Sequence, residues 1–221
     1  MADTIKRDWL IIILLIAPFV IALYFWNLLP DEFPIHFNSK GEVDRYGTKA
    51  VGLFMLPGMN IVLYFLLIAI PHIDPLKKNF NLFSSHYFLI RLIIHLFLGL
   101  IFVLTVMFAL GYNVDITLVI NYALIALLLA LGNYMGTIRK NYFIGIRTPW
   151  TLANDYVWTK THRFTSRLWV VSCLAMMVAM PFLPRNTFIV IAFILVISLI
   201  PVVYSYVIFA RDATTNEKAK E

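Results

Sequence analysis

The side chains that could do chemistry gather in two polar segments of the sequence, residues 29–49 and residues 137–167. In the first segment, His36 and Asp44 flank the turn-forming residues 38–41 and would face each other if the chain folds back as a β-hairpin. The pair fits either a proton site or a hydrogen bond that fixes the hairpin. Two ligands are too few for zinc, which needs three or four, so we expect no metal here.

The second segment alternates aromatic and basic side chains, and its run 145–150 cannot form a regular helix because it contains glycine and proline. Thr151 is a suitable N-cap for a helix that begins at Leu152 and lies in the membrane interface before the next apolar run. One interpretation is a surface segment that packs under the membrane helices. The other is a docking surface for a cytoplasmic partner, or a polar pocket in which Arg147 and His162 bind a phosphate or carboxylate.

Two further ionisable side chains, Arg91 and His95, lie one helical turn apart inside an apolar run. Ionisable residues at membrane depth are functional candidates by default. For His95 the two interpretations are a proton relay and a hydrogen bond to a neighbouring helix. The sequence has no His-Glu-x-x-His pair, no Gly-x-Ser-x-Gly elbow and no glycine-rich phosphate loop. We therefore expect no catalytic residues and no cofactor, and an enzyme is the less favoured class of protein.

Six apolar runs must position these groups. The chain is 61% hydrophobic and only 14% charged, with a mean hydropathy of +0.83, so it has too little charge to cover a water-facing surface. A helix needs about 20 predominantly apolar residues to cross a bilayer. The sequence thus predicts an all-α polytopic membrane protein with six transmembrane helices, a small extracellular β-hairpin after the first and a cytoplasmic interfacial helix before the fifth. The expected spans are Leu10–Trp26, Ala50–Ile70, Tyr87–Leu110, Ile116–Met135, Leu168–Pro184 and Thr187–Ala210.

Lysine and arginine set the expected orientation, because cytoplasmic segments of membrane proteins carry an excess of them. Fourteen of the 18 fall on the face that holds both termini and four on the other, so we expect both termini in the cytoplasm. The same bias accounts for the net charge of +6 without nucleic-acid binding. The expected domains are a two-helix membrane unit with the hairpin at residues 1–86, a four-helix membrane unit at 87–210 and a disordered cytoplasmic tail at 211–221.

Each polar segment carries a recognisable pattern. In the first, a Leu-Pro…Pro-x-His-x-Asn…Gly-x-x-Asp pattern consists of Leu29, Pro30, Pro34, His36, Asn38, Gly41 and Asp44. The pattern of the second consists of Gly132, Asn133, Asn141, Tyr142, Gly145, Ile146, Arg147, Thr148, Pro149, Trp150, Thr151, Trp158, Thr161, His162 and Arg163. Together they resemble the SdpI-type immunity protein family and the N-terminal membrane domain of unknown function that accompanies it. Tyr156, Thr165 and Ser166 depart from the family, in which an acidic residue and glycines are common at these places.

The resemblance implies a multi-pass protein of the bacterial plasma membrane that protects the cell from a secreted peptide toxin. It also implies that the toxin-bound protein holds a small transcriptional repressor at the membrane. On this interpretation the outer loop would face the toxin with Pro34, His36, Asn38, Gly41 and Asp44. The inner signature loop would meet the cytoplasmic partner with Asn133, Asn141, Gly145, Arg147, Thr148, Pro149, Trp150, Trp158, His162 and Arg163.

Membrane lipids are the remaining expected partners. Three alternatives stay open at this point. The chain could be a small transporter or channel that uses Arg91 and His95, a membrane enzyme with a polar pocket in the inner loop, or a lipid-packing scaffold without a dedicated ligand.

Overall fold

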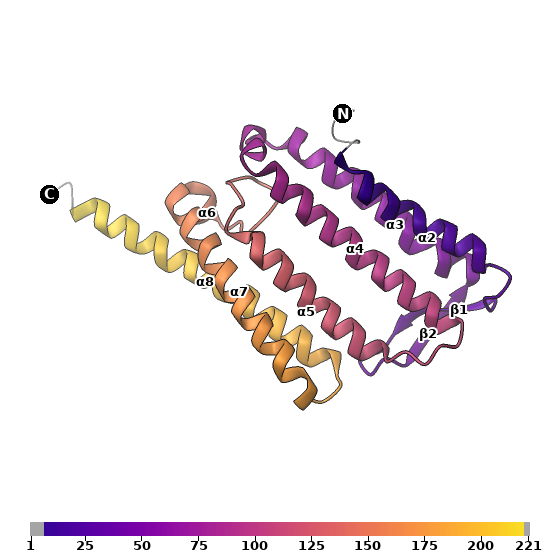
Figure 1. Cartoon of the computed structure of the whole chain (residues 1–221). Coiled ribbons are helices and arrows are strands. Elements are labelled where there is room, and N and C mark those ends of the chain that lie inside the picture. The colour runs from indigo at the N-terminus through magenta and orange to yellow at the C-terminus, as the bar shows by residue number, and fades with distance from the viewer. Residues whose placement is uncertain (1–6, 219–221) are drawn as a thin grey trace. The chain divides into compact units, whose positions relative to one another are not determined.

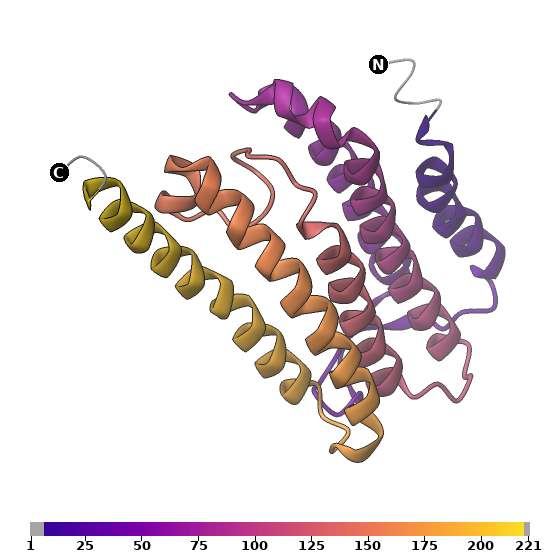
Figure 2. The same ribbon diagram turned by 60° about the vertical axis from the view of Figure 1, so that its left-hand side comes forward.

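The structure is a computed structural model that describes residues 7–218, and its elements can be followed by colour along the chain (Figure 1, Figure 2). Five of its helices are long and apolar enough to cross a membrane, and a shorter apolar helix precedes them. The chain is therefore a polytopic α-helical membrane protein, as its apolar runs predict. The helices are α2 (Trp9–Phe25), α3 (Lys49–Ile73), α4 (Ser84–Ala109), α5 (Ile116–Met135), α7 (Asp155–Ala179) and α8 (Thr187–Lys218).

Short elements connect these helices. Between α2 and α3, β1 (Glu32–Phe37) pairs with β2 (Val43–Thr48) in an antiparallel hairpin. This confirms the predicted hairpin. A 3₁₀ helix, η1 (Lys77–Phe83), leads into α4, and the short helix α6 (Pro149–Ala153) precedes α7. A second 3₁₀ turn, η2 (Met180–Phe182), ends α7.

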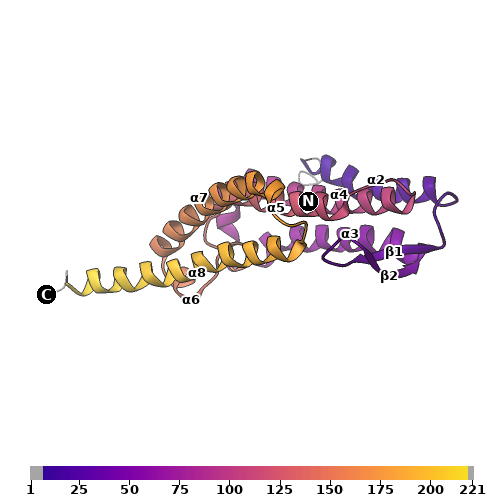
Figure 3. The ribbon, with the colours of Figure 1, turned by 90° about the horizontal axis from the view of Figure 1, so that it is seen from below.

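The chain forms two compact units, and the first comprises described residues 7–68, 88–127 and 184–188. Its core includes Ala22 of α2, Leu53 of α3 and Phe102 of α4, which pack with Phe33 of the hairpin. Phe33 is fully buried because α3 carries glycine at position 52, where a Cβ would lie 2.1 Å from the Phe33 ring. The hairpin therefore rests on the end of α3 (Figure 3), as a two-stranded sheet needs for stability.

The second unit comprises described residues 69–87, 128–183 and 189–218. Its helices α5 and α7 approach closely at Gly132, where a Cβ would lie 2.7 Å from the Cβ of Trp169. The indole Nε1 of Trp169 donates a hydrogen bond to the Ile197 carbonyl oxygen of α8 at 3.1 Å. Small residues at such crossings let membrane helices pack closely. The unit also holds residues 137–167, which we call the signature loop.

Two predicted helix boundaries are wrong. Thr151 does not cap a helix that begins at Leu152; Thr148 is the cap of α6, and Asn154 is the cap of α7 with its side chain accepting from two backbone N–H groups. The segment expected as an interfacial helix is continuous with the fifth span, since α7 runs without a break from Asp155 to Ala179.

The expected disordered tail is helical as far as Lys218, where α8 ends. One contact shows why the helix continues past Arg211: Asn154 Nδ2 donates to the Asp212 carboxylate at 2.8 Å, which attaches this turn of α8 to the start of α7. Residues 219–221 lie outside the described part of the chain.

Candidate functional site

His36 and Asp44 meet across the hairpin, with His36 Nδ1 2.5 Å from Asp44 Oδ1. Their side chains are 58% and 44% exposed, so water screens the pair. The pairing register shifts on both sides of His36, which lies opposite Arg45. The contact that the sequence suggests is therefore present, and it joins the two strands at the surface of the hairpin.

The turn of the hairpin is fixed from both sides. Asn38 Oδ1 accepts hydrogen bonds from the backbone N–H groups of Lys40 and Glu42 at 2.9 and 3.1 Å. Gly41 has φ +82°, and a Cβ there would lie 2.3 Å from Thr117 Oγ1 at the start of α5. Both conditions favour glycine, because side chains rarely adopt this φ and no space is left for one. The turn is thus pressed against α5.

The connection between α4 and α5 and the connection before α8 lie at the same end of the first unit as the hairpin. Ser39 accepts a backbone hydrogen bond from Thr187 N at 3.1 Å. Arg185 Nη1 lies 2.7 Å from the Asp115 carboxylate. The three connections that the sequence assigns to the less positive face therefore lie together.

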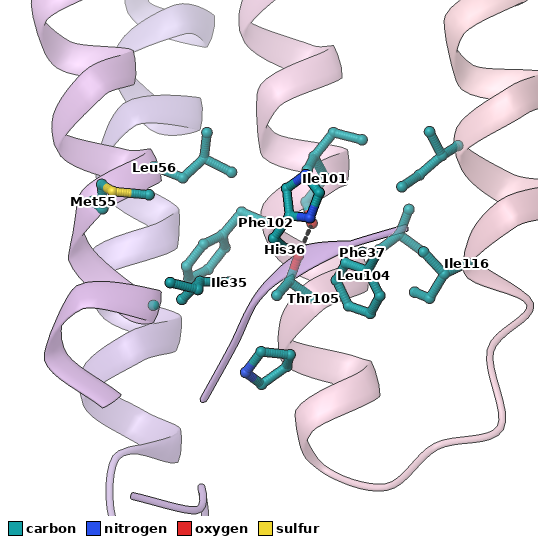
Figure 4. Close-up of a pocket in the computed structure, with 13 residues that line it drawn as sticks. Ile35, His36, Phe37, Met55, Leu56, Ile101, Phe102, Leu104, Thr105 and Ile116 are labelled. Carbon is teal, nitrogen blue, oxygen red and sulfur yellow. Dashed lines mark hydrogen bonds between the residues drawn. The ribbon is translucent and has the colours of Figure 1, made fainter. Parts of the chain in front are cut away.

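A cavity of about 280 Å³ lies beneath β1, with a lining that comes from β1, α3, α4 and α5 (Figure 4). Pro34 is buried in it, and Ile101, Leu56 and Ile116 are among its apolar walls. Only His36 and Thr105 bring polar side chains. The Thr105 hydroxyl donates to the Ile101 carbonyl, so the cavity offers a mainly apolar surface beside the exposed histidine.

In the second unit, the amide of Asn141 organises the first half of the signature loop. Its Oδ1 accepts from the N–H groups of Phe143 and Ile144, while its Nδ2 donates to the carbonyls of Arg139 and Ile144. The loop is also held by Asp74, whose Oδ2 accepts from Tyr142 N at 2.8 Å. Asn141 and Asp74 are both nearly inaccessible to solvent, which suits their structural use.

His162 closes the loop from α7. Its Nε2 accepts from Ile146 N at 3.1 Å, and its Nδ1 lies 2.8 Å from the Trp158 carbonyl, to which it donates. These two bonds require the neutral imidazole with its hydrogen on Nδ1. Gly145 has φ +107°, and a Cβ there would lie 2.3 Å from His162 Nε2. Trp158 stacks on the imidazole with ring centroids 4.0 Å apart.

The second half of the signature loop docks on α8. Thr148 and Thr151 form a reciprocal capping box, with Pro149 as the first residue of α6. The Trp150 indole N–H donates to the Ser205 hydroxyl, which in turn donates to the Val202 carbonyl at 2.6 Å. Most of the predicted polar side chains of the loop are thus occupied within the protein.

A few of the predicted side chains point outward. Arg147, Arg163 and Asn133 are exposed, and Arg147 Nη1 donates to the Tyr142 carbonyl at 2.6 Å. Tyr142 and Phe143 are 45% and 38% exposed beside it. Asn133 lies on α5 before the loop, and we call the other exposed side chains, Arg147, Arg163, Tyr142 and Phe143, the accessible face of the loop. Arg147 and His162 do not form a shared anion pocket, because the histidine is buried and both its nitrogens are engaged.

Arg91 and His95 belong to a buried group in the first unit, which we call the polar cluster. Arg91 Nη2 lies 2.6 Å from Asp8 Oδ1, and the Tyr64 hydroxyl donates to Asp8 Oδ2 at 3.3 Å. His95 Nδ1 lies 2.6 Å from Asn60 Oδ1. All five side chains are at most 6% exposed.

Four of these contact residues escape prediction from the sequence: Asp8, Tyr64, Asp74 and Ser205. Asp8 offers one signal, since a carboxylate directly before an apolar run needs a partner if the run enters a membrane. Asp74 and Ser205 give none, because their roles depend on segments far along the chain. Within residues 7–218, no group of three or more His, Cys, Asp or Glu side chains is placed to hold a metal ion.

Comparison with known proteins gives a family match for each of the two polar segments, residues 29–49 and residues 137–167. The SdpI/YfhL protein family matches residues 137–205, and a domain of unknown function, DUF1648, matches residues 13–61. The chain is 29% identical over 194 residues to the immunity protein SdpI of Bacillus subtilis (strain 168), which covers 87% of this chain and 89% of that protein. No solved structure matches the chain.

The DUF1648 match contains the hairpin, and the SdpI/YfhL match contains the signature loop. Their order along the chain is that of the two patterns found in the sequence. The first region runs through the hairpin into α3, and the second runs from the signature loop through α7 into α8, where Ser205 holds Trp150. Similarity to the immunity protein extends over nearly the whole length of both chains. The part of the chain from the signature loop into α8, residues 137–205, therefore matches the SdpI/YfhL protein family.

Proposed function

We propose that this chain is an immunity protein of the bacterial plasma membrane that protects its cell from a secreted, membrane-active peptide. The similarity to an immunity protein over 87% of the chain is the observation that carries the proposal. The apolar helices, which are long enough to cross a membrane, support a location where such a peptide acts. No chemical conversion is needed, because binding alone can keep a peptide from the lipid.

The cavity beneath β1 is the proposed site for the peptide. A pocket that is mainly apolar with a few polar groups at its edge is the usual form of a binding site. Its volume of about 280 Å³ suits one large apolar side chain, while His36 and Asp44 at the hairpin surface remain accessible to the rest of a peptide. Peptides that enter membranes are rich in such side chains.

Survival under toxin challenge tests this proposal. A toxin-sensitive bacterium expressing the chain is exposed to sporulation-delaying peptide toxin, the toxin implied by the resemblance to SdpI-type immunity proteins, beside the variants Ile101→Trp and Leu100→Trp. Ile101 lines the cavity, so the indole fills it, whereas its neighbour Leu100 is 41% exposed on α4 and does not line it. We expect wild type and Leu100→Trp to protect, and Ile101→Trp to survive no better than cells without the protein.

All three proteins must reach equal abundance in the membrane for the comparison to hold. Protection by Ile101→Trp equal to wild type would reject the cavity as the peptide site. Failure of folded wild-type protein to protect would reject immunity to that toxin.

We also propose that the accessible face of the signature loop holds a small transcriptional repressor at the membrane once peptide is bound. Its exposed arginines and aromatic rings, Arg147, Arg163, Tyr142 and Phe143, are types enriched at protein interfaces. Membrane fractionation in the challenged cells tests this step. Arg163→Glu should leave the repressor soluble while protection persists; retention of the repressor by this variant would contradict the assignment.

A further inference from the structure

The polar cluster contains a buried ion pair in the first unit. Asp8 is fully buried and Arg91 is 2% exposed, and both lie on helices or helix starts of the apolar first unit. Buried ionised groups are energetically costly unless they are paired. Their charges cancel, so the cluster is neutral as long as the His95 imidazole is neutral.

The hydrogen bond to Asn60 fixes the tautomer of His95. Asn60 Oδ1 is a carbonyl oxygen and can only accept, so His95 Nδ1 must carry the hydrogen across their 2.6 Å contact. The other ring nitrogen, Nε2, then presents a basic lone pair. It is buried and has no hydrogen-bond partner among residues 7–218. A buried basic nitrogen without a donor is a site where a proton can bind.

Groups from every element of the cluster act on that nitrogen. Asp8, directly before α2, supplies the negative charge that favours an imidazolium. Arg91 lies one turn before His95 on α4 and opposes it by like charge. From α3, Asn60 orients the ring, and the Tyr64 ring lies 5.9 Å from it while its hydroxyl bonds to Asp8. A single side chain therefore links the imidazole to the carboxylate.

We infer that His95 is a proton-binding site inside the membrane region, with the proton taken up from water at Nε2. The bound proton adds a cation to a neutral cluster, so the imidazolium and Arg91 compete for one carboxylate. Asp8 joins the start of α2 to α3 and α4 through Tyr64 and Arg91. Proton binding therefore weakens the attachment of the start of α2.

Nitrogen-15 NMR of histidine-labelled full-length protein in lipid nanodiscs tests the site directly. The signal lost in His95→Gln identifies the residue, and His86→Gln, which alters a ring packed on Tyr134 in the second unit, is the matched control. The titration runs from about pH 8 down to about pH 3, so that it extends well beyond the ordinary histidine pKa on the acidic side. We expect a neutral ring with its hydrogen on Nδ1 at the upper end and conversion to imidazolium on acidification.

Two isosteric variants should shift the pH at which His95 is half protonated in opposite directions. Asp8→Asn removes the negative charge and leaves Arg91, so His95 should protonate only at lower pH. Asn60→Asp places a carboxylate against Nδ1, so His95 should protonate at higher pH. A ring that stays neutral over the whole range in both wild type and Asn60→Asp would overturn the inference, as would a neutral ring protonated on Nε2.

Hydrogen exchange measured by mass spectrometry tests the consequence. After correction for the intrinsic effect of pH, amides at the start of α2 should exchange faster once His95 is protonated in wild type, but not in His95→Gln. Equal exchange in the two proteins at both ends of the titration would refute the coupling to Asp8.

Discussion

The amide of Asn141 uses both its oxygen and its nitrogen to hold four backbone groups of the signature loop. Aspartate has the same shape but cannot donate, so Asn141→Asp would leave the Arg139 and Ile144 carbonyls facing a buried carboxylate oxygen. Each unsatisfied buried group costs about 1–3 kcal/mol. We expect the free energy of unfolding to fall by at least about 2 kcal/mol, measured by thermal or denaturant unfolding in mild detergent.

Asn133→Asp is the control for this change, because Asn133 is exposed near the end of α5. An exposed substitution of this kind usually changes stability by no more than about 0.5 kcal/mol. Equal stability of the two variants would show that the Asn141 amide does not hold the loop.

Residue identities predict some of these contacts and not others. His36 and Asp44 could be paired from the sequence because a short turn brings them together locally. Asp8 meets Arg91 across 83 positions, and Trp150 meets Ser205 across 55, so these contacts depend on how helices pack. Arg91 and His95 are buried in the first unit, and their partners are visible only in the fold.

At the scale of elements, hydropathy and turn chemistry predict the hairpin and the apolar helices, because lipid and chain geometry leave few other arrangements. The residues at which helices begin in the signature loop are harder to predict. Thr148, Thr151 and Asn154 are all good caps by type. In the structure, Thr148 is the N-cap of α6, which begins at Pro149, and Thr151 completes the capping box. Asn154 is the N-cap of α7. Only the three-dimensional contacts decide between such neighbours.

The path of the loop also explains why α7 starts earlier than its apolar part. The first turns of α7 carry His162 and Trp158 to the loop, and the Trp158 indole donates to the Ile138 carbonyl at 2.9 Å. The polar first turns of α7 therefore bind the backbone of the preceding loop residues. Hydropathy alone places the beginning of the helix at Leu168, because it measures only the part that favours lipid.

At the scale of the whole molecule, the orientation in the membrane and the division at residues 86 and 87 stay predictions. Both proposed binding events depend on the orientation, because a secreted peptide must meet the hairpin and a repressor must meet the signature loop. Fourteen of the 18 lysines and arginines favour termini in the cytoplasm. The hairpin would then lie outside the cell and the signature loop inside.

Cysteine labelling in intact cells measures this orientation. The single native cysteine, Cys173, is buried, and Cys173→Ala removes any background from it. In that chain, Lys40→Cys reports on the hairpin and Lys160→Cys on α7, both at exposed positions. A maleimide that cannot cross the membrane should label Lys40→Cys in intact cells and Lys160→Cys only after the cells are opened. The reverse pattern would place the signature loop outside the cell, where the proposed repressor cannot reach it and a secreted peptide can.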